Sequence, residues 1–261
     1  TGKVLSAVET AYEAGKIKRV CIQALNFSEV FVHLLSLIHA INQKTKVPIS
    51  VSCQPLNIEN IRRLSEAGAD RIGIPIDAAT PELFDKVKGQ TAGGPYRWEE
   101  QLKILTEAVD ILGKGKVSTH LIVGLGETER EMVNAIQKFS DVGVLPAIFA
   151  FTPIAGTALE DRKQPPIQSY RRIQIARYLI VNGVASSDRM RFSENGDLTN
   201  FGVKEEDLVQ IVQTGEPFRT SGCPNCNRPY YNEKPSGPMY NYPNSLTAKN
   251  ISEIKTQLSY K

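Results

Sequence analysis

The chain has 261 residues, of which 23% are charged, and a formal net charge of +3. Its lysines and arginines are spread along the sequence without a dense basic block, which argues against nucleic acid as the main partner. No run approaches 18 apolar residues and the N-terminus has no signal-peptide pattern, so we expect a cytoplasmic protein with no membrane partner.

Segments with helical periodicity alternate along the chain with short runs of strand character. The predicted helices cover residues 3–14, 27–42, 58–67, 96–112, 129–142, 169–182, 204–213 and 246–258. The predicted strands cover residues 19–23, 47–53, 70–77, 117–125, 147–151, 190–193 and 217–221. Strands separated by helices of this length are typical of βαβ units, in which the strands are parallel.

The order of these segments predicts an α/β barrel. The chain begins with a helix, and one strand upstream of Thr1 would complete the eight strand–helix steps of a (β/α)8 TIM-type barrel. A doubly wound sheet is the alternative, although Gly124-Leu-Gly126 lacks the third glycine of a dinucleotide-binding turn. We assign residues 1–222 to the barrel and residues 223–261, rich in proline, asparagine and tyrosine, to an irregular C-terminal extension that caps it.

The strands of a parallel barrel end on one face, which carries the catalytic groups. All four cysteines lie close to predicted strand ends, and they are Cys21, Cys53, Cys223 and Cys226. Four thiolates on one face can hold an iron–sulfur cluster or a zinc ion, and their scattered spacing favours the cluster. Separate cysteines buried in the core are the alternative.

Three other side chains near strand ends or within strands have more than one interpretation. Asp77 can accept two hydrogen bonds from a ribose diol, or it can cap the helix that begins near Thr80. Arg191 points either inward to an anion or outward to solvent, and strand alternation alone does not decide between them. His120, in the middle of a strand, can face the barrel interior.

Several segments together resemble the radical S-adenosylmethionine (SAM) superfamily, in its biotin synthase-like branch. Residues 121–128 (Leu-Ile-Val-Gly-Leu-Gly-Glu-Thr) resemble the fifth strand, which contacts adenine, and residues 65–77 resemble the third helix and the fourth strand, whose acid binds the ribose of SAM. Residues 190–196 are similar to the seventh strand, whose arginine binds an auxiliary cluster. Residues 219–226 (Arg-Thr-Ser-Gly-Cys-Pro-Asn-Cys) and the tyrosine-rich tail resemble the archaeal-type, two-protein lipoyl synthases.

The resemblance implies a radical SAM barrel whose first strand, together with the CxxxCxxC loop that binds the SAM-cleaving [4Fe–4S] cluster, is missing from this chain. The residues implied to bind SAM are Asp77, Arg97, Ile122, Gly124, Glu127 and Phe151. The ligands implied for an auxiliary [4Fe–4S] cluster are Cys21, Cys53, Cys223 and Cys226. Arg191 and Ser221 are implied to lie at the catalytic site as further candidate ligands of that cluster.

The implied activity is sulfur insertion from the auxiliary cluster into an octanoyl chain attached to a lysine of a lipoyl carrier protein. A partner lipoyl synthase subunit and an electron donor are implied with it. Ser118 departs from the pattern because biotin synthase carries a cysteine there, and Cys53 lies about three residues beyond the third-strand cysteine of that enzyme. Biotin synthase-like or other radical SAM chemistry is the first alternative, and a non-catalytic barrel with a structural zinc is the second.

Overall fold

The computed structural model describes residues 2–55, 57–224, 226–228 and 237–259. The chain divides into two compact units, each assembled from several segments. The first unit consists of Thr1–Ile76, Glu99–Thr119 and Val142–Leu145, and the second consists of Asp77–Trp98, His120–Asp141 and Pro146–Lys261.

The core of the fold is a parallel sheet of five strands, as the alternation of helices and strands predicts. In chain order and in spatial order these are β1 (Val20–Gln23), β2 (Ile49–Ser52), β3 (Ala69–Gly73), β4 (Val117–Val123) and β5 (Val144–Ala150). Along β4, Val117, Thr119 and Leu121 are buried, whereas Ser118 and His120 between them are half-buried. This alternation gives the strand one apolar face and one more polar face.

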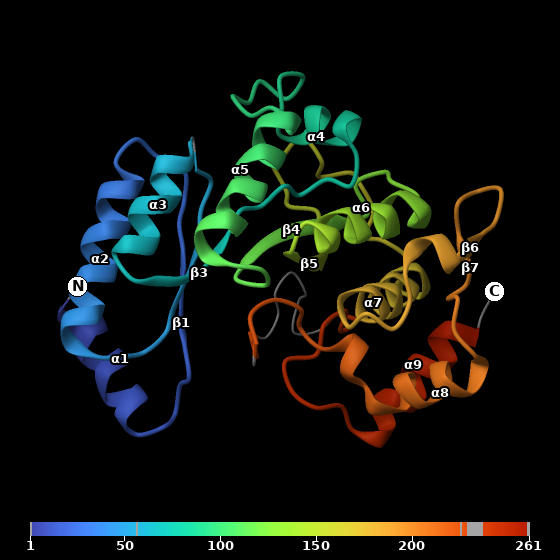
Figure 1. The fold of residues 1–261 in the computed structure, drawn as a ribbon. Helices are drawn as coiled ribbons and strands as arrows, with labels where there is room; N and C mark the ends of the chain where they lie inside the picture. The colour runs from blue at the N-terminus through green and yellow to red at the C-terminus, as the bar shows by residue number, and fades with distance from the viewer. Residues whose placement is uncertain (1, 56, 225, 229–236, 260–261) are drawn as a thin grey trace. The chain divides into compact units, whose positions relative to one another are not determined.

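Four helices belong wholly or mainly to the first unit. They are α1 (Gly2–Glu13), α2 (Val30–Lys44), α3 (Ile58–Glu66) and α5 (Trp98–Leu112). Helix α2 buries Val30, Leu34, Ile38 and Ile41, which recur every three or four residues and therefore form one apolar stripe. Helices α2 and α3 pack side by side, and α3 also contacts β3 (Figure 1). The helix predicted over residues 27–42 thus contributes an apolar stripe to the core of this unit.

Helix α7 (Ile167–Val181) organises the second unit. It packs against α6 (Glu129–Asp141), the 3₁₀ turn η2 (Glu216–Phe218) and α9 (Ala248–Ser259). Because it has neighbours on several sides, α7 buries residues all around its axis and has no single apolar stripe. The remaining helical elements of the unit are α4 (Pro81–Val87), η1 (Ser187–Arg189) and α8 (Glu205–Thr214).

In the parts of the chain that the structure describes, no helix is both long enough and apolar enough to cross a lipid bilayer.

The last two predicted parallel strands are wrong. Residues 190–193 contribute β6 (Arg191–Phe192), which pairs antiparallel with β7 (Leu198–Asn200). Asn195-Gly196 lies between them, Gly196 has a φ of +85°, and Asn-Gly is a strong hairpin signal. Residues 217–221 begin inside η2, where Pro217 has no N–H to donate to a sheet. Among the described residues, the five-stranded sheet therefore does not close into a barrel.

A buried arginine holds the C-terminal segment onto α7. Arg171 is fully buried, and its guanidinium donates to the side chains of Gln174 (2.6 Å) and Gln257 (3.0 Å). It also donates to the backbone carbonyls of Met239 and Tyr240. The aromatic rings of residues 218 and 242 both lie 5.6 Å from the guanidinium carbon. One cation thus connects α7, η2, α9 and the chain around residue 240.

Candidate cofactor-binding site

Small polar residues line one face of the sheet in the first unit. Gln23 pairs with Ser52, Ser52 with Gly73, and Gly73 with Ser118. A Cβ atom added to Gly73 would lie 3.1 Å from the hydroxyl oxygen of Ser118 and 3.5 Å from that of Ser52, so these positions share a face. Cys21 lies two residues before Gln23 on β1 and is exposed on the same face. The thiol of Cys21, the amide of Gln23 and the hydroxyls of Ser52 and Ser118 therefore share this face.

Cys53 lies on the opposite face of the sheet. It extends β2 by one residue, and its N–H donates to the carbonyl of Gly73 (3.1 Å). Because successive strand residues alternate, Cys53 points away from the face of Ser52 and Cys21. Its side chain is 3% exposed, and burial raises the pKa of its thiol to about 12. Since a metal ligand must be a thiolate, burial disfavours metal binding by Cys53 in this position.

Alkylation of the folded protein is expected to distinguish these two thiols. Iodoacetamide should modify Cys21 at about pH 8, whereas Cys53 should react roughly 100-fold more slowly because its thiolate form is suppressed and its sulfur is covered. Peptide mass spectrometry over a time course measures both rates, and the urea-unfolded protein provides the control in which both react. Equal rates in the folded protein would contradict the placement of Cys53.

Asp77 is held in a strained backbone conformation just beyond β3. It has a φ of +69°, and it is the only non-glycine residue with a positive φ in the described part of the chain. Its N–H donates to the carbonyl of His120 (2.8 Å), and its carbonyl accepts from the N–H of Ile122 (2.7 Å). Such a conformation costs roughly 1–3 kcal/mol and persists only where the surrounding structure imposes it. The strain makes this residue a functional candidate.

The carboxylate of Asp77 forms an ion pair instead of capping a helix. Helix α4 is capped by Thr80, whose hydroxyl accepts from the N–H of Leu83 (3.3 Å), so the capping interpretation of Asp77 is not supported. Lys88, directly after α4, places its ammonium 2.6 Å from Oδ2 of Asp77 and 5.6 Å from the centre of the Tyr96 ring. The side chains of Asp77 and Lys88 are 25% and 12% exposed, so the pair is partly shielded from water.

His120 lies next to this ion pair and stays neutral. Its ring meets the Phe149 ring edge-on, with 4.9 Å between their centres. Burial lowers the pKa of His120 to about 4; the carboxylate of Asp77 opposes this, and the cations of Lys88 and Arg228 reinforce it. At neutral pH the site therefore contains an imidazole that can both donate and accept a hydrogen bond.

The acid stability of the protein is expected to depend on His120. Its folded-state pKa of about 4 lies below its ordinary value of 6.5, so the neutral ring contributes stability that is fully present above pH 6.5 and is lost as the pH falls toward 4. The His120→Gln variant removes this titration and should lose less stability across that range. Urea unfolding at about pH 7 and pH 5 measures the difference, and parallel losses in both proteins would contradict it.

Glu127 closes the glycine turn that follows β4. Its carboxylate accepts from the N–H groups of Gly124 (2.6 Å) and Leu125 (3.0 Å), while Gly124 and Gly126 have φ values of +105° and +123°. Burial raises the pKa of Glu127, and the backbone donors of the turn oppose this rise. The carboxylate is thus already occupied in shaping the turn, and Glu127 acts as a positioning residue there.

A cavity of about 230 Å³ lies beside this turn. Its lining includes Gly124, Gly126, Arg162, Pro165 and Ile173. A Cβ atom at Gly124 would come within 2.9 Å of the Pro165 ring, so a side chain there would clash with the wall.

The Gly124→Ala variant is therefore expected to lose about 2–4 kcal/mol of stability, because it combines this clash with an unfavourable φ. Chemical unfolding measures the loss, and Gly156→Ala, with a positive φ but open space, isolates the strain.

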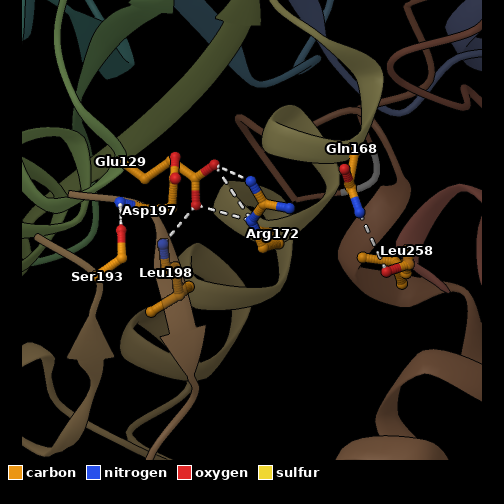
Figure 2. A network of polar contacts seen from close by, with 7 residues as sticks. All are labelled: Glu129, Gln168, Arg172, Ser193, Asp197, Leu198 and Leu258. Carbon is orange, nitrogen blue, oxygen red and sulfur yellow. Dashed lines mark hydrogen bonds and ion pairs between the residues drawn. The ribbon is translucent and has the colours of Figure 1, made fainter. Parts of the chain in front are cut away.

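Two residues after Glu127, the chain enters the polar network shown in Figure 2. Glu129, the first residue of α6, is buried and accepts hydrogen bonds from the guanidinium of Arg172 on α7, including one of 2.8 Å from Nε. The same carboxylate accepts from the N–H of Leu198 on β7 (2.8 Å). One acid thus connects α6, α7 and the β6–β7 hairpin just after the glycine turn in sequence.

The other residues predicted to bind SAM occupy different settings. Ile122 donates its N–H to Asp77, so these two predicted residues are in direct contact. Phe151 lies at the end of β5 and donates its N–H to Val123 (2.9 Å). Arg97 turns back on its own loop, where it donates to the carbonyl of Tyr96 (2.9 Å). Arg97 is thereby placed as a loop-stabilising side chain.

The two predicted catalytic residues do not lie on parallel strands. Arg191 is exposed on the β6–β7 hairpin. Ser221 is buried, and its hydroxyl accepts from the N–H of Ile148 on β5 (2.9 Å). The hydroxyl of Ser221 thus satisfies the backbone of β5.

Cys223 and Cys226 lie in one turn of the second unit. The N–H of Cys226 donates to the carbonyl of Cys223 (3.0 Å). Burial raises the pKa of the Cys226 thiol, and the neighbouring Cys223 raises it further. Taking each unit by itself, the described residues contain no group of three or more histidine, cysteine or acidic side chains placed to bind a metal.

Lys88 is the site residue that the sequence did not indicate. Lys86 and Lys88 lie two positions apart in the sequence, and the sequence pattern does not show which of them contacts Asp77. The two lysines differ because α4 ends at Val87: Lys86 lies exposed on the helix, whereas Lys88 follows it and contacts Asp77.

Comparison with known proteins identifies relatives that share this fold. The sequence profile of the Radical SAM superfamily matches residues 3–139. The 7,8-didemethyl-8-hydroxy-5-deazariboflavin synthase of Methanocaldococcus jannaschii is 21% identical over 168 residues, covering 61% of this chain and 45% of that protein. The chain therefore spans about half the length of this curated relative.

Two solved structures have the same fold at low sequence identity. Methylornithine synthase (PylB) superposes with a TM-score of 0.55 at 13% identity, covering 70% of this chain and 53% of that one. HydG, a maturase of the [FeFe]-hydrogenase, superposes with a TM-score of 0.52 at 12% identity, covering 69% and 43%. At these identities the likeness concerns the fold alone.

Proposed function

The chain belongs to the radical SAM superfamily, and from this we propose that it forms the SAM-binding part of an enzyme that cleaves SAM reductively. The observation that carries the proposal is Asp77, a strained acid beyond β3 whose carboxylate is oriented by an ion pair. Strained, partly shielded charged groups are characteristic of binding sites.

The described residues fit SAM in part. The carboxylate of Asp77 has two oxygens, which can accept hydrogen bonds from a ribose diol. The glycine turn at 124–126 lines the 230 Å³ cavity, with Pro165 packed closely against Gly124. The 261 residues contain no CxxxCxxC sequence, so we assign no residue of this chain to the SAM-cleaving [4Fe–4S] cluster. When bound, cluster and SAM together supply hydrogen-atom abstraction, and the chain supplies placement.

The substrate class is the finer part of the proposal. We place sulfur insertion into an octanoyl chain first, with a lipoyl carrier protein, a partner lipoyl synthase subunit and an electron donor in the cytoplasm. Its support is the Cys223–Cys226 turn, which carries two cysteines three residues apart. Cys53 fits less well, because it would have to leave a buried position on the other sheet face before binding a cluster.

A second candidate is radical SAM chemistry without sulfur insertion. It is favoured by the relatives found, which are named as a deazariboflavin synthase, a methylornithine synthase and a hydrogenase maturase. The two candidates differ in what the cysteines of the second unit should do. An auxiliary cluster requires Cys223 and Cys226, whereas SAM cleavage alone does not.

Reconstitution of the full-length protein with iron and sulfide under anaerobic conditions tests both candidates. We expect 5′-deoxyadenosine to form from SAM with dithionite, and a thiolated product to form from an octanoyl-lysine carrier domain. The Cys223→Ala/Cys226→Ala variant should lose about four irons per chain and the thiolated product, but should keep SAM cleavage. Cys53→Ala is the matched control and should keep its iron.

The outcomes separate the alternatives. Zinc without acid-labile sulfide would overturn the enzyme proposal and favour a structural metal site. SAM cleavage with no thiolated product, and unchanged iron content in the double variant, would overturn sulfur insertion alone. Both results are measured on the same preparation.

A further inference from the structure

We propose that Lys88 is a positioning residue, which fixes the carboxylate of Asp77 in the orientation that receives the ribose diol of SAM. This inference rests on the function proposed above. It goes beyond it because it assigns a role to a side chain outside the predicted SAM-binding residues. Lys88 acts on the ligand through Asp77.

The main chain of Asp77 is fixed from both sides. Its N–H and its carbonyl are both hydrogen-bonded to β4, at 2.8 Å and 2.7 Å, so the residue cannot relax from its φ of +69° without breaking these bonds. The side chain of an aspartate retains two rotatable bonds beyond that backbone. The ammonium of Lys88, 2.6 Å from Oδ2, restricts them. Because the ion pair uses one carboxylate oxygen, the second keeps its acceptor capacity for hydroxyl groups.

Lys88 is itself held in place. Its N–H donates to the carbonyl of Phe84 (2.9 Å) and so ends α4. Phe84 is buried and meets the Trp98 ring edge-on, with 5.6 Å between centres. The ammonium therefore extends from a backbone position anchored in the core of the second unit. With 12% of its side chain exposed, Lys88 loses less of its interaction to solvent screening than a surface lysine does.

The opposite role for Lys88 would be competition with the ligand. In that case the lysine would have to leave Asp77 before SAM could bind, and its removal would tighten binding. Positioning instead predicts that removal weakens binding, because the carboxylate then samples several rotamers and loses a charge-assisted partner. The two roles thus predict changes of opposite sign in the dissociation constant.

Equilibrium binding of SAM to the reconstituted full-length protein tests this inference. Lys88→Met should raise the dissociation constant about tenfold, and Lys88→Arg should restore it to within about threefold of the wild type because the positive charge returns. Lys86→Met is the matched control, since Lys86 is exposed one position before α4 ends, and it should bind like the wild type. Circular dichroism and thermal unfolding establish that the variants are folded.

A second ligand pair separates positioning from a general structural effect. The probes are 5′-deoxy-5′-methylthioadenosine and its 2′-deoxy analogue, measured with the wild type and with Lys88→Met. If the lysine acts through Asp77 on the diol, the variant should weaken binding of the first probe and leave that of the 2′-deoxy probe nearly unchanged. Equal weakening of both probes would overturn the inference.

The remaining outcomes are also decisive. Unchanged or tighter SAM binding by Lys88→Met would overturn the positioning role while leaving the proposed function intact. Absence of SAM binding by the wild-type protein itself would overturn the proposed function, and this inference with it. The inference would be established if Lys88→Met weakened SAM binding tenfold, Lys88→Arg restored it, and the effect of Lys88→Met depended on the 2′-hydroxyl of the probe.

Discussion

The Arg171→Met variant is expected to unfold with a free energy about 3–5 kcal/mol lower than that of the wild type. The substitution removes a cation that donates to two backbone carbonyls and two glutamine side chains in the buried contact of α7 with the C-terminal segment. A methionine fills much of the volume but donates nothing, so the carbonyl of Met239 and the two glutamine oxygens lose their arginine donor, while the carbonyl of Tyr240 keeps the amide of Gln174 (2.9 Å). Urea unfolding followed by circular dichroism measures the difference.

Limited proteolysis gives a second measure of the same variant. Because Arg171 connects α7 to the chain around residue 240, its loss should expose the segment leading into α9 to cleavage at lower protease concentration. Arg62→Met is the matched control, because Arg62 is exposed and its ion pair with Glu59 is long at 3.7 Å. A change below about 1 kcal/mol in Arg171→Met would contradict the assigned role.

The Glu129→Ala variant is expected to lose about 3–4 kcal/mol of stability. It leaves the guanidinium of Arg172 without its carboxylate and the N–H of Leu198 without an acceptor, both in a shielded setting (Figure 2). Chemical unfolding measures the loss, and hydrogen exchange should show faster exchange at the Leu198 amide. Glu206→Ala, at an exposed position of α8, is the control and should change stability by less than about 0.5 kcal/mol.

A double-mutant cycle separates the ion pair from the backbone contact. Arg172→Met alone should cost less than Glu129→Ala, because the carboxylate keeps the N–H of Leu198 as a partner. The double variant should cost less than the sum of the two single variants. Additive losses, or unchanged protection of the Leu198 amide in Glu129→Ala, would contradict the network.

The sequence predicted the strand–helix alternation well because the first five strands are short segments with buried apolar residues, separated by helices. The predictions for the last two strands were wrong because turn-forming residues in these segments outweighed their apolar character. Asn195-Gly196 sends the chain back as a hairpin, and Pro217 begins a 3₁₀ turn. The Asn-Gly pair and the proline are both visible in the sequence, and a strand-like composition alone does not override such turn-forming residues.

The cysteines show what strand alternation can and cannot reveal. Between residues 49 and 53 the order Ile-Ser-Val-Ser-Cys places Cys53 on the apolar side, whereas Val-Cys-Ile-Gln at residues 20–23 places Cys21 on the polar side. The sequence thus contained the signal that separates these two thiols, although proximity to a strand end suggested a shared face. The pairing of Asp77 with Lys88 had no such signal, because it depends on where α4 ends.

The closure of the glycine turn by Glu127 bears on the kind of nucleoside that the proposed SAM site would select. Glycine turns after a strand commonly present their amides to phosphate groups. Here the amides of Gly124 and Leu125 already point at a carboxylate from the same chain. A phosphate approaching them would meet a negative charge in place of donors. If this turn lines the SAM site proposed above, it would therefore disfavour nucleotides such as ATP and favour nucleosides without a phosphate at this position.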